Sequence, residues 1–224
     1  MIKLVCRSLS YCLLMVSFVG LFQLYFFACC VEQDSELTLS ASGRSEVRDS
    51  DVRAEEWTDI CGNAHQLFAS GADRLCVLVF VTTDCPVANA YQPTLREIAK
   101  EFADAEVDFY QINPTKSATI EKAKQHVADF KIASPMILDP DQTIARRVGA
   151  KATPESFLIS PQEEILYRGR IDDLYVGFGN RRQSPTSHDL RDAITAALAA
   201  KPISTSVTKP TGCLIQYDKG SPCH

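Results

Sequence analysis

The order of apolar segments predicts an α/β fold, with a central, mostly parallel sheet, flanking helices and an antiparallel hairpin at one edge. Three observations predict it. Short apolar runs alternate with segments of helical periodicity between residues 75 and 148. The run at residues 76–81 is unbroken and stops at polar residues, which is typical of a strand buried on both faces. Two further strand-like segments, residues 156–159 and 165–168, are joined by a short polar turn.

The remaining elements follow from the same two periodicities. Residues 57–69 are expected to form a first helix containing Cys61, because apolar side chains recur at helical spacing. Further helices are predicted at residues 88–102, 117–130, 141–148 and 190–200, and further strands at 107–112 and 135–138. Pro93 should kink the helix that contains it, and Ser117 should cap the helix that follows.

The N-terminus predicts export from the cytoplasm. Lys3 and Arg7 precede residues 8–31, which contain no charged side chain. This span is longer than the apolar core of a signal peptide, so an uncleaved membrane anchor is favoured over a cleaved signal or a lipoprotein signal. We expect four regions: a signal or anchor at residues 1–31, a flexible linker at 32–52, a folded domain at 53–201 and an irregular, cysteine-containing tail at 202–224.

Composition narrows the function classes. The net charge is −5 and no dense Lys/Arg patch is present, which argues against a nucleic-acid partner. Nine cysteines is many for a reducing compartment, whereas disulfides persist outside the cytoplasm. Five of them lie beyond the N-terminal apolar segment: Cys61, Cys76, Cys85, Cys213 and Cys223. An odd number leaves at least one thiol free unless a bond forms between chains.

Cys85 is the candidate reactive residue. It follows the buried strand and begins a helix, with Pro86 suited to the first helical position. A thiol there faces unpaired backbone N–H groups and the positive end of the helix dipole, which lower its pKa and make the sulfur a nucleophile. Thr82 is placed to aim its hydroxyl at the sulfur. The alternative is a buried, unreactive cysteine of the core.

This arrangement resembles the thioredoxin fold. Pro93 lies eight residues after Cys85, the offset of the helix-kinking proline in thioredoxins, and Thr153-Pro154 stands where those proteins have a cis-proline loop facing the active-site sulfur. Residues 134–160 resemble the strand and helix inserted in larger redoxins. These include the alkyl hydroperoxide reductase and thiol-specific antioxidant superfamily and the membrane-anchored thiol-disulfide oxidoreductases. The resemblance covers residues 57–200 and implies a thioredoxin-like fold and oxidoreductase or antioxidant activity.

The chain departs from the patterns of both enzyme groups. Disulfide oxidoreductases of this fold carry Cys-x-x-Cys, but Ala88 replaces the second cysteine here. Peroxiredoxins carry Thr-x-x-Cys, which Thr82 and Cys85 satisfy. Their proline before that threonine is Val79 in this chain, and Pro154 occupies the place of their catalytic arginine.

Other charged residues near these motifs allow several interpretations. Arg168 and Arg170, on the edge hairpin, are the nearest substitutes for the missing arginine. Glu155 follows Pro154 and either lies near Cys85 or points to solvent. Asp172 and Asp173 are interpreted as part of a solvated loop rather than a cation site.

The first functional hypothesis is a thiol-dependent oxidoreductase. The Cys85 thiolate would attack a peroxide or a disulfide, and Cys213 in the tail would resolve the intermediate. Alternatively, Cys213 pairs with Cys223 and leaves Cys85 to an external thiol. The expected partners are a thiol reductant or a disulfide-bearing protein, with the membrane contacted through the N-terminal segment. No cofactor is expected.

The second hypothesis is a binding module. A redox-inactive adaptor could hold a peptide at the proline loop. Copper delivery is also possible on this scaffold, but Cys85 has no second cysteine at short spacing and the histidines are scattered, so no resident metal is expected. Reactivity of Cys85 would separate the adaptor from the enzyme.

Overall fold

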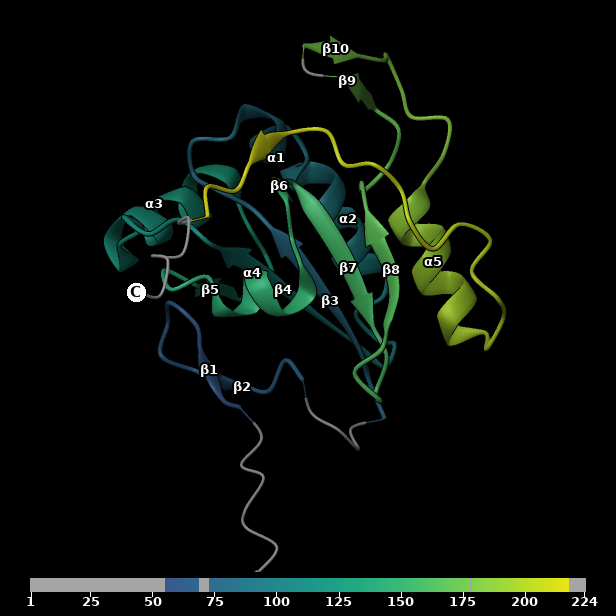
Figure 1. The fold of residues 1–224 in the computed structure, drawn as a ribbon, viewed down its shortest axis with the longest axis horizontal. Helices are drawn as coiled ribbons and strands as arrows, with labels where there is room; N and C mark the ends of the chain where they lie inside the picture. Colours follow the sequence, from purple (N-terminus) through teal and green to yellow (C-terminus); the bar gives the residue numbers. More distant parts are fainter. Residues whose placement is uncertain (1–54, 69–72, 178, 218–224) are drawn as a thin grey trace, which may run out of the picture. The chain divides into compact units, whose positions relative to one another are not determined.

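The central feature of the computed structural model is a five-stranded mixed sheet (Figure 1). The structure describes residues 55–68, 73–177 and 179–217, all within one unit that spans residues 51–224. In sheet order the strands are β5 (Met136–Leu138), β4 (Val107–Asn113), β3 (Leu75–Phe80), β7 (Glu155–Ile159) and β8 (Ile165–Gly169). Strands β5, β4 and β3 are parallel, whereas β7 and β8 form an antiparallel hairpin that pairs with β3. The predicted α/β fold is confirmed.

Helices cover both faces of the sheet (Figure 1). They are α1 (Pro86–Ala90), α2 (Gln92–Glu101), α3 (Ile120–Phe130), α4 (Thr143–Val148) and α5 (Asp189–Leu198). Every residue of β3 is buried, and its side chains alternate between two cores. Val77 and Val79 share one core with residues of α2 and α5, while Leu78 and Phe80 share the other with residues of α4. Burial on both faces explains the unbroken apolar run.

The predicted helix at residues 57–69 is wrong, because this segment begins with a short antiparallel hairpin. Strand β1 (Trp57–Thr58) pairs with β2 (Ala64–His65). Between them the Asp59 carboxylate accepts hydrogen bonds from the backbone and side-chain amides of Asn63, at 2.9 and 3.0 Å. Gly62 has φ +92°, a conformation that glycine adopts readily. A carboxylate that collects local N–H donors stabilises a turn at the expense of a helix.

Two further expectations about helices need correction. The segment 88–102 is not one kinked helix, because α1 and α2 are separate and Tyr91 lies between them. Pro93 lies at the start of α2, where its missing N–H costs no helical hydrogen bond. Ser117 does not cap α3. The cap is Thr119, whose hydroxyl accepts a hydrogen bond from the Lys122 N–H at 3.3 Å.

The remaining strands lie outside the main sheet. They are β6 (Ala152–Thr153), β9 (Tyr175–Gly177), β10 (Asn180–Arg181) and β11 (Cys213–Leu214). Strands β9 and β10 form a small hairpin that projects from the rest of the domain (Figure 1). The tail was expected to be irregular from Pro202, but β11 pairs antiparallel with β6. Cys213 and Leu214 are therefore held against the residues that precede Pro154.

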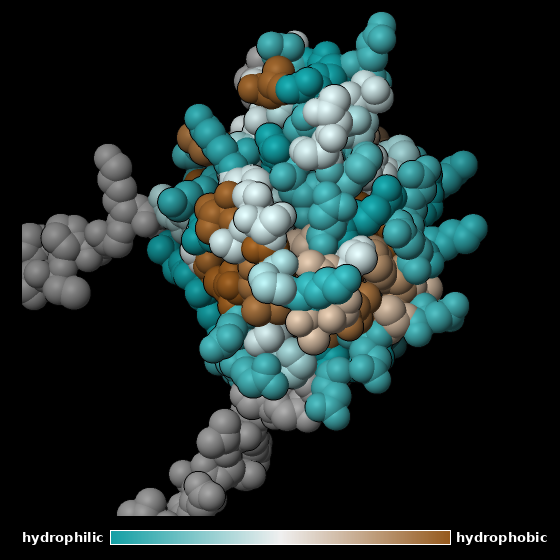
Figure 2. Space-filling view, turned by 90° about the vertical axis from the view of Figure 1, so that its right-hand side faces the viewer, coloured by the Kyte–Doolittle hydropathy of each residue, from teal (hydrophilic) through white to brown (hydrophobic). Residues whose placement is uncertain are grey.

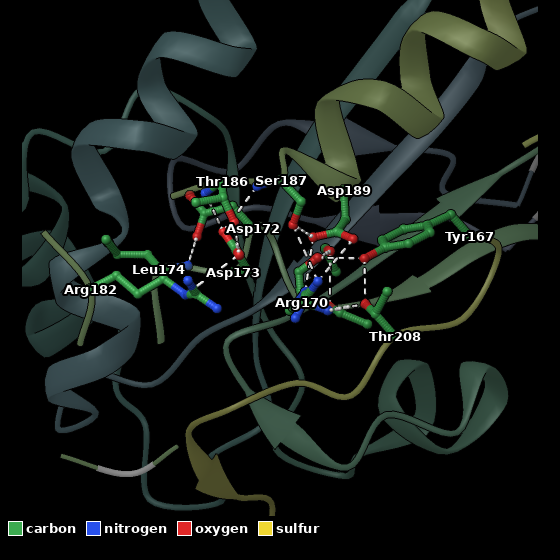
Figure 3. Close-up of polar contacts among 12 residues, drawn as sticks. Tyr167, Arg170, Asp172, Asp173, Leu174, Arg182, Thr186, Ser187, Asp189 and Thr208 are labelled. Carbon is green, nitrogen blue, oxygen red and sulfur yellow. Dashed lines mark hydrogen bonds and ion pairs between the residues drawn. The ribbon is translucent and has the colours of Figure 1, made fainter. Parts of the chain in front are cut away.

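Asp172 and Asp173 are buried, so their interpretation as a solvated loop is wrong (Figure 3). Asp172 accepts hydrogen bonds from the Tyr91 hydroxyl at 2.6 Å and the Leu174 N–H at 2.8 Å. Asp173 accepts from the hydroxyl and the backbone N–H of Thr186, and these bonds hold the pKa of its carboxyl well below the usual range. Both carboxylates are satisfied by protein donors, as buried charges must be.

The surface on the side of α5 is partly apolar (Figure 2). Leu198 of α5 and Ile165 of β8 are each 41% exposed. A shallow cavity of about 380 Å³ lies between the end of α5 and the start of the tail, lined by Leu166, Ala197, Lys201, Pro202, Ile203 and Ser206. The tail thus leaves α5 beside an apolar surface.

The predicted signal or anchor at residues 1–31 and the predicted linker at residues 32–52 lie outside the described residues. In the part of the chain that the structure describes, no helix combines the length and the apolar character needed to cross a bilayer. Cys223 also lies outside the described residues, so its pairing with Cys213 stays a prediction.

Candidate active site

Cys85 lies at the junction of β3 and α1, as the sequence predicts. It is the N-cap residue of α1, and its sulfur accepts a hydrogen bond from the Ala88 N–H at 3.4 Å. Pro86 occupies the start of the helix. The Cys85 side chain is buried at 1% exposure, in contact with residues from three separate segments of the chain. Position at a helix N-terminus favours the thiolate.

The Pro154 loop faces the sulfur. The Thr153–Pro154 peptide bond is cis, as the resemblance to thioredoxins implies. The Thr153 carbonyl oxygen lies 2.9 Å from the Cys85 sulfur and accepts a hydrogen bond from the protonated thiol. Thr82 does not aim its hydroxyl at the sulfur as expected. Its oxygen lies 3.4 Å from the Thr153 hydroxyl, so Thr82 contacts Cys85 through Thr153.

Cys213 of the tail lies beside Cys85. Strand β11 places Cys213 directly opposite Thr153, and the Thr153 hydroxyl donates to the Cys213 carbonyl oxygen at 3.4 Å. The thiol and the backbone N–H of Cys213 lie close enough to the Cys85 sulfur to lower its pKa. The pairing of β11 with β6 brings together two cysteines that are more than a hundred residues apart in the sequence.

The two thiols have opposite pKa shifts. Burial favours the neutral form of Cys85, but the hydrogen bonds from Ala88, Cys213 and Thr153 outweigh it and lower the pKa of Cys85. Burial and the neighbouring Cys85 thiolate raise the pKa of Cys213 to about 11. Of the two thiols, Cys85 therefore has the lower pKa and loses its proton first. Only the thiolate is a strong nucleophile.

The charged residues singled out near these motifs do not contact the sulfur. Glu155 is buried, and its carboxylate accepts from the backbone N–H groups of Lys151 and Ala152 at 2.5 and 3.1 Å. Arg168 donates to the Gly149 carbonyl oxygen at 2.9 Å and lies 3.5 Å from Glu155. Glu155 thus supports the backbone that precedes Pro154 rather than acting on Cys85.

Arg170 is also directed elsewhere. Its guanidinium is paired with Asp189 at 2.9 Å and donates to the Ser187 hydroxyl (Figure 3). The groups whose hydrogen bonds lower the Cys85 pKa are Ala88, Cys213 and Thr153, and none is an arginine. Neither edge-hairpin arginine therefore substitutes for the catalytic arginine of peroxiredoxins.

Comparison with protein families is consistent with this geometry. The model of the AhpC/TSA family matches residues 51–168, which is more than half of the chain. The chain belongs to the AhpC/TSA family. No match to a curated protein was found.

Solved structures resemble this AhpC/TSA protein in fold. A hypothetical protein of Sinorhizobium meliloti is 26% identical with a TM-score of 0.64, and covers 75% of this chain and 94% of its own. An uncharacterized conserved protein of Geobacillus kaustophilus is 24% identical with a TM-score of 0.63, covering 75% and 92%. A structure described as a thiol:disulfide interchange protein, DsbE, of Chlorobium tepidum is 19% identical with a TM-score of 0.51, covering 64% and 92%. At this identity it shows the fold alone.

Two features of the site were missed in the sequence. Gly212 precedes Cys213 and lies against the Thr153 carbonyl, where a side chain would not fit. Asn89 of α1 donates to the Thr83 carbonyl oxygen at 2.9 Å, and its own side-chain oxygen lies 2.8 Å from His126 Nε2. The position of Asn89 one helical turn after Cys85 was the available signal for the second feature.

Polar and apolar side chains both surround the site. A cavity of about 570 Å³ extends between the loop after β3 and the tail, lined by Thr82, Asp84, Pro114, Thr115, Lys116, Ser117, Gln142, Leu214, Ile215, Gln216 and Tyr217. Among the residues that the structure describes, no group of three or more His, Cys, Asp or Glu side chains is placed to hold a metal ion.

Proposed function

We propose that this protein is a thiol-disulfide oxidoreductase in which Cys85 is the nucleophile and Cys213 the resolving thiol. The observation that carries the proposal is that Cys213 lies opposite Thr153, whose carbonyl oxygen touches the Cys85 sulfur, and that the two thiols shift each other's pKa in opposite directions. The second cysteine that is missing from the position of Ala88 is supplied by the tail. Thr82, Thr153 and Pro154 complete the site by holding the two thiols in place.

The reaction we propose consumes one disulfide and oxidises both thiols. The Cys85 thiolate attacks one sulfur of a disulfide, forming a mixed disulfide and releasing the other sulfur as a thiolate. Cys213 then attacks the Cys85 sulfur and gives up its proton to the departing thiolate. The products are two substrate thiols and a Cys85–Cys213 disulfide. Two thiols of a reductant restore the dithiol: the first opens the Cys85–Cys213 bond to a mixed disulfide, and the second releases the protein thiol and joins the first in a disulfide.

Peroxide reduction is the second candidate, favoured by the Thr82-x-x-Cys85 motif and by the family. Cys85 would attack the O–O bond to give a sulfenic acid and water, and Cys213 would condense with it, releasing a second water and forming the same disulfide. The positions of Arg168 and Arg170 speak against it, because neither cation reaches the sulfur.

The experiment compares the two oxidants on the reduced full chain. Hydrogen peroxide and glutathione disulfide are added separately, and the linked cysteines are identified by peptide mapping at early times. We expect a Cys85–Cys213 link that forms faster with the disulfide than with peroxide. In Cys213→Ser the expected product is a mixed disulfide on Cys85. A faster reaction with peroxide would assign the peroxidase function, and a Cys213–Cys223 link would remove Cys213 from the mechanism.

The proposal includes a location outside the cytoplasm, where a thiol reductant or a disulfide-bearing protein would be the partner. It is supported by the charge-free span at residues 8–31 after Lys3 and Arg7. Fusing a reporter that is active only outside the cytoplasm to the C-terminus tests it. An inactive reporter fusion on an expressed protein would contradict this location.

A further inference from the structure

The tail crosses the domain as a strap, which we define as residues 206–217. It first runs beside β8, where the Arg168 N–H donates to the Ser206 carbonyl oxygen at 2.9 Å and the Thr208 N–H donates to the Arg168 carbonyl oxygen at 3.0 Å. It then pairs with β6 through β11, and the Ile215 N–H donates to the Lys151 carbonyl oxygen at 3.0 Å. The strap is thus bound by backbone hydrogen bonds, as an added strand is.

Side chains hold the start of the strap. The Thr208 hydroxyl lies 2.6 Å from the Tyr167 hydroxyl and accepts from the Arg170 N–H at 3.0 Å (Figure 3). Gly169 allows this approach, because a Cβ there would overlap Thr208. These contacts place the start of the strap at a fixed point on β8.

Side chains also hold the end of the strap. Gln142 donates to the Gln216 carbonyl oxygen at 2.8 Å, and the Tyr217 hydroxyl donates to the Ala150 carbonyl oxygen at 2.6 Å. The Tyr217 ring also lies under the Arg146 guanidinium, 4.9 Å from its centre. Because these contacts hold both ends of the strap, its central residues pass over the site that contains Cys85.

The centre of the strap occupies the strand edge next to Cys85. The residues opposite each other are Cys213 with Thr153 and Leu214 with Ala152, immediately before the cis bond to Pro154. An extended peptide that brought its own cysteine to Cys85 along this edge would need the same backbone groups of β6. Each backbone group can be used by only one strand at a time.

We infer that the strap is an internal copy of an extended peptide substrate, and that a peptide disulfide reaches Cys85 only by replacing it on β6. This inference rests on the proposed function and names its substrate class: a segment in which glycine precedes the cysteine. Cys85 is 1% exposed with the strap in place, so displacement also uncovers the sulfur.

Gly212 is the residue that defines this class. A Cβ built on Gly212 would overlap the carbonyl oxygen and carbon of Thr153 and come within 3.0 Å of the Pro154 ring. The φ of Gly212 is not in the left-handed region, so the requirement for glycine is one of space rather than backbone conformation. A substrate lying where the strap lies meets the same carbonyl, and any side chain before its cysteine meets the same overlap.

The exchange itself balances without a further reactant. The Cys85 thiolate attacks the peptide cysteine of a peptide–glutathione disulfide. A Cys85–peptide disulfide forms, the original S–S bond breaks, and glutathione leaves as its thiolate and takes a proton from solvent. Cys213, displaced with the strap, resolves the adduct when it returns.

The test releases the strap by substituting Gly212. Reduced full-length protein is compared with Gly212→Ala, in which the added methyl overlaps Thr153. Gly177→Ala is the matched control, because nothing lies within 4 Å of the Cβ it would add. The probes are glutathione disulfides of the peptides Thr-Gly-Cys-Leu-Ile and Thr-Ala-Cys-Leu-Ile, with glutathione disulfide itself as the small probe. For each probe, the rate measured with Cys85→Ser is subtracted from the total rate. This removes the contribution of the exposed Cys61.

We expect Gly212→Ala to raise the rate with the glycine peptide by about tenfold, the equivalent of one or two backbone hydrogen bonds to the strap. The gain should be smaller for the alanine peptide and smallest for the small probe, and Gly177→Ala should match the unsubstituted protein. Equal gains for all three probes would mean that the strap only covers the sulfur, and no gain with the peptides would mean that they do not use β6. Either result overturns the inference, while Cys85-dependent reaction with the small probe keeps the proposed function intact. Absence of any Cys85-dependent reaction would instead overturn the proposed function.

Discussion

The pKa of Cys85 depends on a few polar groups around its sulfur. Cys76, in the strand that precedes Cys85, provides the contrast, because burial raises the pKa of its thiol far above the ordinary value. Cys85 is also buried, but the N–H of Ala88 and the N–H and thiol of Cys213 lower its pKa. Burial favours the neutral thiol at Cys85 as well, but these donors outweigh it and lower the pKa.

Removing the Cys213 thiol should therefore raise the pKa of Cys85. In Cys213→Ala one hydrogen bond to the thiolate is lost, and the pH midpoint of Cys85 alkylation should move up towards the ordinary thiol value of about 8.5. Cys213→Ser keeps a hydroxyl donor and should show a smaller upward shift. The measurement is the alkylation rate of Cys85 against pH, read by peptide mapping. The midpoint is used because the plateau rate also depends on access. An unchanged midpoint in Cys213→Ala would contradict the assignment of Cys213 as a donor.

The first hairpin is stabilised by one ionised carboxylate. Asp59 is buried, which by itself raises its pKa, but hydrogen bonds from His65, Asn63 and Cys61 outweigh burial and hold the pKa well below its usual range. A carboxyl with a lowered folded-state pKa contributes stability above its unfolded value of about 3.9 and loses it as the pH falls towards the folded value. The hairpin should thus be sensitive to acid.

We expect Asp59→Asn to lower the free energy of unfolding at pH 7 by about 1–3 kcal/mol. The difference from the unsubstituted protein should be constant above about pH 5 and should shrink steadily below about pH 4, as the carboxyl is protonated in the unfolded chain. Denaturant unfolding at pH 7, 5, 4 and 3 measures it. A difference that grows towards low pH would have the wrong sign for a stabilising carboxylate.

The junction of α1 and α2 is tied to the loop after β8 by one buried contact. The Tyr91 hydroxyl donates to the Asp172 carboxylate at 2.6 Å, and burial followed by this contact raises the pKa of Tyr91. Tyr91→Phe leaves a buried carboxylate one donor short and should cost about 1–3 kcal/mol of unfolding free energy. Tyr175→Phe is the control, because Tyr175 is only partly buried and its ring packs 5.5 Å from that of Tyr91. We expect less than about 0.5 kcal/mol for this second variant. Equal costs in denaturant unfolding would show that the Asp172 contact is not the cause.

At the scale of the whole molecule, periodic sequence patterns predicted the sheet and most helices, because each depends on a continuous buried face. The unbroken run before Cys85 is the clearest case, since both faces of β3 are covered. The helix predicted from Trp57 is wrong because apolar spacing carries no information about the backbone N–H groups that donate to Asp59. Cys85 and Thr153-Pro154 were identified in the sequence from their positions next to predicted strands. The sequence allowed the proximity of Cys213 and Cys85 only as a hypothesis. The strap reaches Cys85 through contacts with residues that are far from it in the sequence, and no local pattern predicts such contacts.

Oxidation of the pair should stabilise the whole domain. A Cys85–Cys213 disulfide would close a loop of roughly 130 residues and fix the strap to α1, which reduces the entropy of the unfolded chain by the equivalent of about 3–5 kcal/mol. We expect the oxidised full chain to unfold at higher denaturant concentration than the reduced chain, with no such difference in Cys85→Ser or Cys213→Ser. Denaturant titrations with and without reductant measure it, after peptide mapping has verified the link. Lower stability of the oxidised form would show that the two sulfurs must strain the site to join, and that the reduced pair is the favoured state.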